Sequence, residues 1–320
     1  MKKNYLYAVV ALIVLFVFSS CKSTKVVFTM PFAAEADSEA PVTKVDKPSS
    51  KDKSTEVKVD KSSVKKDIQL VRADTFALGV DTYSPIIKYS SKHTKSDYSE
   101  IQRVVKYDFT HRDIPAAFEG FRIAFVSDLH YKSLFDEVGL EELVKLISSL
   151  QPDVLLMGGD YQEGCEYVEP LFSALAQIEV PMGIYGVMGN NDYERCHEDI
   201  VQTMKKYGMH PLEHQVDTLH KDGQQIIIAG VRNPFDLKAN GISPTLALSP
   251  KDFVVLLVHT PDYIEDVSIE NTDLALAGHT HGGQVRILGS VPANNSHYGK
   301  RFISGLAYNS KKQPINLSSG

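Results

Sequence analysis

The feature that most constrains the fold is a recurring pattern in which a short apolar run ends at a residue with an oxygen or nitrogen donor. Such runs, bounded by turn residues, are typical of strands buried on both faces of a sheet. Between the first two of these runs, apolar residues recur at helical spacing, for example Leu140, Leu143 and Ile147. Alternating strands and helices favour parallel pairing, with the helices as crossovers.

The runs and their periodicity predict an α/β fold. A core of two mixed sheets with outer helices, in four layers ordered α-β-β-α, fits them most simply. The alternation over residues 101–107 indicates an edge or lead-in strand, and Gly208 is placed to cap a helix over 200–204 in the left-handed conformation. Further strands are expected over 121–126, 154–157, 184–188, 225–229, 253–258 and 274–277, and further helices over 140–147 and 171–178.

Five of these strands are followed by candidate metal ligands. Because open sheets bind ligands beyond the carboxyl ends of their strands, we expect these side chains to gather on one rim. A single Gly-Asp or Gly-Asn pair is by default an ordinary turn, but the joint recurrence predicts a site. Carboxylate, amide and imidazole without thiolate suit Mn, Fe or Zn better than Ca or a structural zinc site. The candidate ligands are Asp128, His130, Asp160, Asn190, His259, His279 and His281.

These motifs resemble the calcineurin-like metallophosphoesterase superfamily. Its five blocks are Asp-x-His, Gly-Asp, Gly-Asn-His-Asp/Glu, a lone His and Gly-His-x-His, and their counterparts stand here in the same order, within a resemblance that runs from about residue 101 to the end. The run Gly-His-Thr-His-Gly-Gly-Gln at 278–284 resembles the bacterial branch that includes cell-envelope phosphoesterases and hydrolases similar to UDP-2,3-diacylglucosamine pyrophosphatase. The resemblance implies a metallophosphoesterase sandwich and a metal-dependent phosphoesterase.

Carried over by position, the resemblance implies two divalent metal ions as cofactors. A shared carboxylate fixes two cations about 3.5 to 4 Å apart, and such a pair lowers the pKa of a bridging water until hydroxide exists near neutral pH. That hydroxide would attack phosphorus in line while the metals neutralise the developing charge. The implied assignment gives the first ion to Asp128, His130 and His281, the second to Asn190, His259 and His279, and the bridge to Asp160.

One residue departs from the family pattern. Where the third block usually has His, this chain has Asn191, and an amide can hydrogen-bond an oxygen but cannot deliver a proton. Because general acid catalysis typically contributes about 10²- to 10⁴-fold, we expect a bias toward good leaving groups such as phosphoanhydrides or aryl esters. His197 and His297 are candidate substitutes, and the alternative is that both are plain surface or packing residues.

Cys165 and Cys196 each follow a metal-bearing block closely, so both are expected near the same rim. The N-terminal residues, described next, indicate export from the cytoplasm, and an extracytoplasmic environment favours oxidation of the two thiols to a disulfide. Two unpaired cysteines are the alternative. A disulfide would close a loop of about 30 residues and contribute roughly 3 to 4 kcal/mol in the chain-entropy model.

Residues 1–21 resemble a bacterial lipoprotein signal peptide. Two lysines precede an apolar run over 5–18, shorter than the roughly 20 residues that span a membrane, and small residues then lead to Cys21. The resemblance implies export and lipidation of Cys21, with the protein anchored in the cell envelope on its periplasmic or outer face; an uncleaved membrane anchor is the alternative. Residues 22–75, rich in Lys, Ser and Asp, are expected to form a disordered tether, and 76–320 the phosphoesterase domain.

The sequence therefore predicts hydrolysis of phosphoester or phosphoanhydride bonds outside the cytoplasmic membrane, on a phosphorylated substrate for which lipid-linked phosphates are one option. The alternative is a metal-binding, catalytically silent envelope lipoprotein that recognises a phosphorylated ligand. A net charge of -6 with scattered Lys and Arg argues against nucleic acid as a partner. Family members generally continue beyond the position of residue 320, so we expect a C-terminal truncation, either natural or as a fragment. No pattern predicts the oligomeric state.

Overall fold

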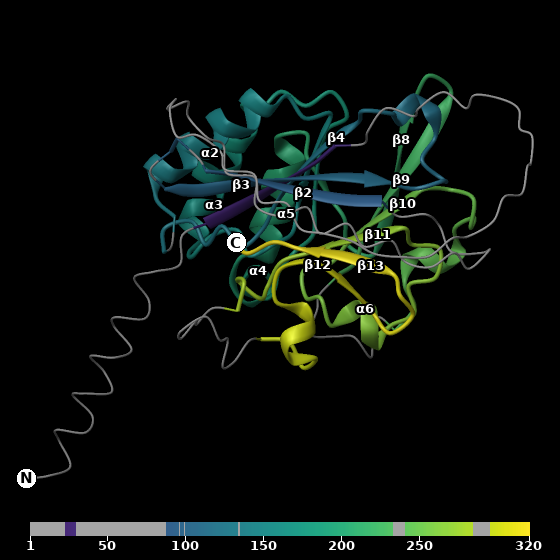
Figure 1. Cartoon of the computed structure of the whole chain (residues 1–320). Helices are drawn as coiled ribbons and strands as arrows, with labels where there is room; N and C mark the ends of the chain where they lie inside the picture. The colour runs from purple at the N-terminus through teal and green to yellow at the C-terminus, as the bar shows by residue number, and fades with distance from the viewer. Residues whose placement is uncertain are drawn as a thin grey trace, which may run out of the picture.

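Two sheets and the helices on their outer faces make up the structure, a computed structural model (Figure 1). It describes residues 23–29, 88–95, 97, 98, 100–133, 135–232, 241–283 and 295–320. The seven-stranded sheet has the order β2-β3-β1-β4-β5-β6-β7, and the six-stranded sheet has the order β12-β13-β11-β10-β9-β8. Both sheets combine parallel and antiparallel pairs, as the sequence predicts.

The bounds of the elements follow the labels of Figure 1. The first sheet contains β1 (Ser23–Thr29), β2 (Lys88–Lys95), β3 (Ile101–Thr110), β4 (Arg122–Val126), β5 (Val154–Met157), β6 (Ile184–Gly186) and β7 (His210–Pro211). The second contains β8 (Gln215–Lys221), β9 (Gln224–Gly230), β10 (Val254–Leu257), β11 (Leu274–Ala277), β12 (Gly305–Tyr308) and β13 (Pro314–Leu317). The helices are α2 (Glu137–Leu150), α3 (Val168–Leu175), α4 (Asn190–Arg195), α5 (His197–Lys206) and α6 (Tyr263–Asp266).

Alternate residues of the central strands face different layers. In β4, Ile123 and Phe125 enter the core between the two sheets, whereas Ala124 and Val126 enter the core beneath α2, α3 and α5. A third core joins the outer face of the second sheet to α6. The layers are therefore α-β-β-α, and burial on both faces explains why the strands are continuous apolar runs.

Parallel pairing brings the ends of the central strands to a common rim. The strands β4, β5 and β6 pair in parallel in the first sheet, as do β9, β10 and β11 in the second. The helices α2 and α3 are the crossovers of the first sheet. Because the chain leaves each strand at this rim, the loops that follow the strands, with their polar residues, lie side by side.

The strand β1 corrects the expected organisation of the N-terminal part. Seven residues of the expected tether 22–75 belong to the first sheet, where β1 pairs in parallel with β3 and antiparallel with β4. The run at 26–28, Val-Val-Phe, has high β propensity, and pairing on both sides satisfies its backbone groups. With β2 on its other side, β3 is therefore an interior strand, whereas its alternation indicates an edge or lead-in strand.

The expected signal peptide, 1–21, lies outside the described residues. Among those that are described, no helix is both long enough and apolar enough to cross a membrane.

Candidate metal centre

The seven predicted ligands lie together at the rim. Six of them form two groups in which the donor atoms lie within 4.8 Å of one another. Asn190 adjoins the second group, since its Oδ1 is 3.1 Å from Nε2 of His259. The first group is Asp128, His130 and His281, and the second is Asp160, His259 and His279.

The spacing inside each group fits a shared cation. Nε2 of His130 lies 3.2 Å from Nε2 of His281, and Nδ1 of His279 lies 3.2 Å from Nε2 of His259. Ligands at about 2.1 Å from a tetrahedral ion stand about 3.4 Å from one another, close to these separations. The nitrogen and oxygen donors, without a thiolate, suit Mn, Fe or Zn.

Asp160 connects the two groups. Its Oδ2 lies 3.7 Å from Nε2 of His130 in the first group and 3.4 Å from Nε2 of His259 in the second. One carboxylate oxygen thus faces ligands of both groups, which is the position that a bridging ligand requires.

Most of the ligands share an unusual backbone conformation. Their φ angles lie in the left-handed region, which non-glycine residues adopt rarely and which is enriched at functional sites. This conformation turns the chain sharply at the strand ends, so that side chains from separate loops can converge. The residues and their φ angles are Asp128 (52°), His130 (41°), Asp160 (53°), His279 (70°) and His281 (47°).

Two glycines allow the backbone to approach the carboxylates. A Cβ atom on Gly189 would lie 2.1 Å from Oδ1 of Asp160, and one on Gly278 would lie 2.2 Å from Oδ2 of Asp128. Both distances are far below van der Waals contact, so any side chain at either position would displace a ligand.

Burial and mutual charge shift the pKa values at the rim. Burial alone would raise the pKa of Asp160, but the charges of His259 and His130 hold it well below its usual range. Burial lowers the pKa of His259, yet the charge of Asp160 outweighs this and raises it to about 10. Burial, followed by the charge of His259, lowers the pKa of His279 to about 4. Asp160 is therefore ionised and His279 is a neutral imidazole, the forms in which these groups bind metals. His259, whose pKa is raised, would have to release its proton on binding a metal ion.

Asp192 ties two of the loops together. Its buried carboxylate accepts hydrogen bonds from the backbone N–H groups of Asp160 (2.8 Å), Tyr161 (3.0 Å) and Gly189 (2.7 Å). Burial and the charge of Asp160 raise its pKa to about 6. No role was predicted for Asp192, although its place in the third block was a usable signal.

Asn191 and Glu163 surround the outer side of His130. The backbone N–H of Asn191 donates to Oδ1 of Asp160 at 2.9 Å, and its side-chain Nδ2 donates to Oε1 of Glu163 at 3.1 Å. The same Oε1 lies 2.6 Å from Nδ1 of His130. Glu163 thus orients a predicted metal ligand, as carboxylates beside ligating histidines do. Nothing in the local sequence around Glu163 indicates this role.

The two histidines considered as substitutes for Asn191 are engaged elsewhere. His197 pairs with Glu213 and stacks on Tyr193 with a centroid separation of 4.4 Å. His297 is 91% exposed beside Asp262. The hypothesis that either supplies the missing proton therefore finds no support in their positions.

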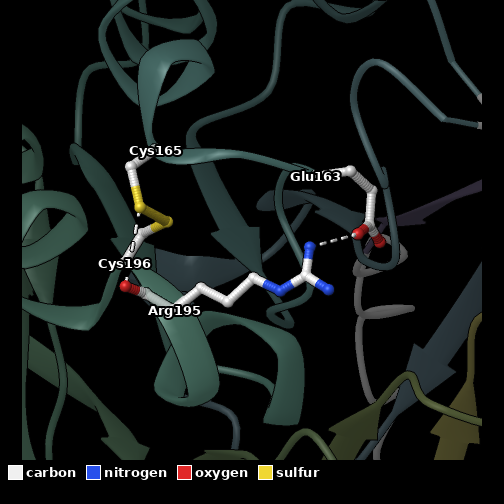
Figure 2. The surroundings of a disulfide bond; sticks show 4 residues. All are labelled: Glu163, Cys165, Arg195 and Cys196. Atoms are coloured by element: carbon white, nitrogen blue, oxygen red, sulfur yellow. Dashed lines mark hydrogen bonds and ion pairs between the residues drawn. A yellow bond between two sulfur atoms is a disulfide. The ribbon is translucent and has the colours of Figure 1, made fainter.

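The cysteine pairing that the sequence left open is present as a disulfide. Cys165 and Cys196 are bonded with their Cα atoms 5.4 Å apart (Figure 2). The bond joins the loop that carries Glu163 to the end of α4. Cys21 lies outside the described residues.

Comparison with known proteins agrees with this geometry. The family model for calcineurin-like phosphoesterases matches residues 121–283. The metallophosphoesterase YkuE of Bacillus subtilis (strain 168) is 29% identical over 199 residues, which cover 60% of this chain and 69% of YkuE. The phosphodiesterase YaeI of Escherichia coli (strain K12) is 30% identical over 198 residues, which cover 58% of this chain and 70% of YaeI.

A solved structure of a 5'-nucleotidase precursor from Thermus thermophilus aligns with 61% of this chain and 47% of its own, with a TM-score of 0.37 and 14% identity. The family match is the stronger finding, because it covers half of this chain and includes all seven rim residues. The chain belongs to the calcineurin-like phosphoesterase family and is a metal-dependent phosphoesterase.

Proposed function

We propose that this chain hydrolyses phosphoester or phosphoanhydride bonds with two divalent metal ions held side by side at the rim. The observation that carries the proposal is the position of Asp160 Oδ2 between the two ligand groups. A bound pair of divalent ions supplies an activated water and neutralises charge on the phosphoryl oxygens. We assign the first ion to Asp128, His130 and His281, the second to Asn190, His259 and His279, and the bridge to Asp160.

Residues beside the ligands determine which substrates react. Glu163 accepts a hydrogen bond from Nδ1 of His130, which leaves the lone pair of Nε2 directed toward the other ligands at the rim. The amide of Asn191 can donate to a phosphoryl oxygen but has no proton for a leaving group. We therefore infer a preference for phosphoanhydrides and aryl esters, whose leaving groups depart as stable anions.

We also propose that the mature chain is exported and anchored through a lipidated Cys21. The strand β1 begins only two residues later and pairs Val26 with Phe125 and Thr29 with Arg122, so its first residue lies at the end of β4 that leads to Asp128. In Figure 1, β1 starts on the side of the molecule where the chain ends, and Gly320 lies beside His281. A lipid at Cys21 would hold the rim near the membrane surface, which favours lipid-linked phosphates as substrates.

The catalytic proposal is tested with Mn(II)-loaded protein on an aryl monoester, an aryl diester, an alkyl diester and a sugar-nucleotide pyrophosphate. We expect hydrolysis of the aryl and anhydride substrates, slower hydrolysis of the alkyl diester, and none by Asp160→Asn. Equal rates on the aryl and alkyl diesters would contradict the role given to Asn191. Binding of inorganic phosphate without turnover of any substrate would instead support a silent binding protein, which the amide at 191 also favours.

The anchoring proposal has a separate test. Labelling with a fatty acid analogue and fractionation should place labelled wild-type protein in the membrane fraction, and Cys21→Ser should carry no label. An unlabelled wild-type protein would exclude lipidation.

A further inference from the structure

Arg195 lies one helical turn beyond Asn191 on α4. Residues four apart share a helix face, so the guanidinium lies on the side of α4 that carries the Asn191 amide. Glu163 lies between Arg195 and the metal centre: its Oε1 contacts Asn191 and His130, and its Oε2 is 3.6 Å from Nη1 of Arg195 (Figure 2). One carboxylate thus separates a permanent positive charge from a predicted metal ligand.

The contact with Glu163 leaves most of the guanidinium available. The Arg195 side chain is 62% exposed, and a separation of 3.6 Å is long for an ion pair with a partly exposed carboxylate. Such a pair contributes little to stability. A guanidinium has five N–H donors in a planar fork that matches two phosphate oxygens, so it can accept an anion while remaining near Glu163.

The disulfide restrains the backbone on both sides of this pair. Cys165 follows Glu163 by two residues, and Cys196 directly follows Arg195. Sγ of Cys165 lies 3.5 Å from the carbonyl oxygen of Arg195, a packing contact because a disulfide sulfur carries no hydrogen (Figure 2). The backbone of Arg195 is therefore held against the Glu163 loop, while its long side chain can still move toward a ligand.

We propose that Arg195 determines specificity by binding the departing phosphate of a phosphoanhydride substrate. The inference rests on the proposed function and names its substrate class. In the reaction the oxygen of water bonds to phosphorus, the bond from phosphorus to the bridging oxygen breaks, and the departing phosphate keeps the electron pair. A proton of the water passes to solvent. The guanidinium neutralises this anion through its charge and hydrogen bonds and transfers no proton to it. This fits a site in which the amide at 191 cannot supply a proton either.

The test compares variants by the ratio of two kcat/KM values, one for a sugar-nucleotide pyrophosphate and one for bis(p-nitrophenyl) phosphate. Only the first substrate has a phosphate as its leaving group, because the second loses p-nitrophenolate. We therefore expect Arg195→Ala to lower the ratio by about 10- to 100-fold, the contribution of a charge-assisted contact. Arg195→Lys should restore part of the loss, because it returns the charge but not the fork. The control is Lys206→Ala, which removes another exposed cation paired with a surface carboxylate, that of Glu169.

An unchanged ratio in Arg195→Ala would overturn the inference. If both kcat/KM values also fall equally, the residue has a structural role. A binding measurement with methylenediphosphonate, a non-hydrolysable anhydride analogue, distinguishes failure of the inference about Arg195 from failure of the proposed function. If wild-type protein hydrolyses nothing, the proposed function fails. Arg195 then keeps only a phosphate-binding role, which requires that Arg195→Ala weaken methylenediphosphonate binding at least tenfold. An unchanged affinity would exclude that role as well.

Discussion

Reduction of the disulfide between Cys165 and Cys196 should destabilise the protein by an amount that follows from the size of the loop. The two residues are 31 apart, and the chain-entropy relation gives about 12 cal/mol/K for such a loop, or about 3.7 kcal/mol at 25 °C. Domains of this size lose about 2 to 4 °C in Tm for each kcal/mol, so Tm should fall by about 7 to 15 °C. Cys165 is exposed, so a reductant can reach the bond in the folded protein.

The assay is urea unfolding of the oxidised wild-type protein with and without a phosphine reductant. The matched control is the double variant Cys165→Ala/Cys196→Ala, whose free energy of unfolding should not respond to the reductant. A loss below about 1 kcal/mol in reduced wild-type protein would refute the reasoning, because it would mean that the loop is equally restrained without the bond.

Three further predictions concern the metal centre, a partly buried carboxyl and the core. Gly189→Ala should prevent loading of two metal ions, because the new methyl would lie 2.1 Å from Asp160 Oδ1; elemental analysis measures the metal content. The control is Gly223→Ala: its φ of 75° strains an alanine, but a Cβ there meets nothing within 4 Å, so this variant should load normally. Burial raises the pKa of Asp273 to about 7 from its ordinary 3.8, so its contribution to stability is lost as pH rises through that range. Asp273→Asn should therefore gain stability relative to wild type between pH 5 and pH 8 in urea unfolding, and an unchanged difference would contradict this. Phe125→Ala, between the sheets, should cost about 3 to 5 kcal/mol, and a loss under 1 kcal/mol would mean that this core is loosely packed.

The central strands and the predicted ligands were accessible from the sequence because their signals are local. β4, β5 and β11 are short apolar runs, and each ends within a few residues of a donor side chain. The topological rule that ligands bind beyond the carboxyl ends of strands was then enough to predict that distant loops meet. Gly208 has a φ of 71°, as expected of a left-handed helix cap.

The remaining features depend on contacts that no local pattern encodes. The sequence predicts a tether at β1 because polar residues surround its short apolar run, whereas its pairing with β4 joins residues about one hundred positions apart. In the sequence, Glu163 and Arg195 are indistinguishable from ordinary surface charges. Only the folded loops bring Glu163 into contact with His130 and Asn191, and Arg195 into contact with Glu163. The sequence does not decide between a disulfide and two free thiols for the same reason, since the separation of two cysteines in space does not follow from their spacing in sequence.

The proposed centre requires two metal ions that share Asp160. Crystals of the protein grown with Mn(II) and measured at the manganese absorption edge test this in one experiment. We expect two anomalous peaks about 3.5 to 4 Å apart, with Asp160 in contact with both. A single peak, or two peaks that do not share Asp160, would contradict the proposed centre.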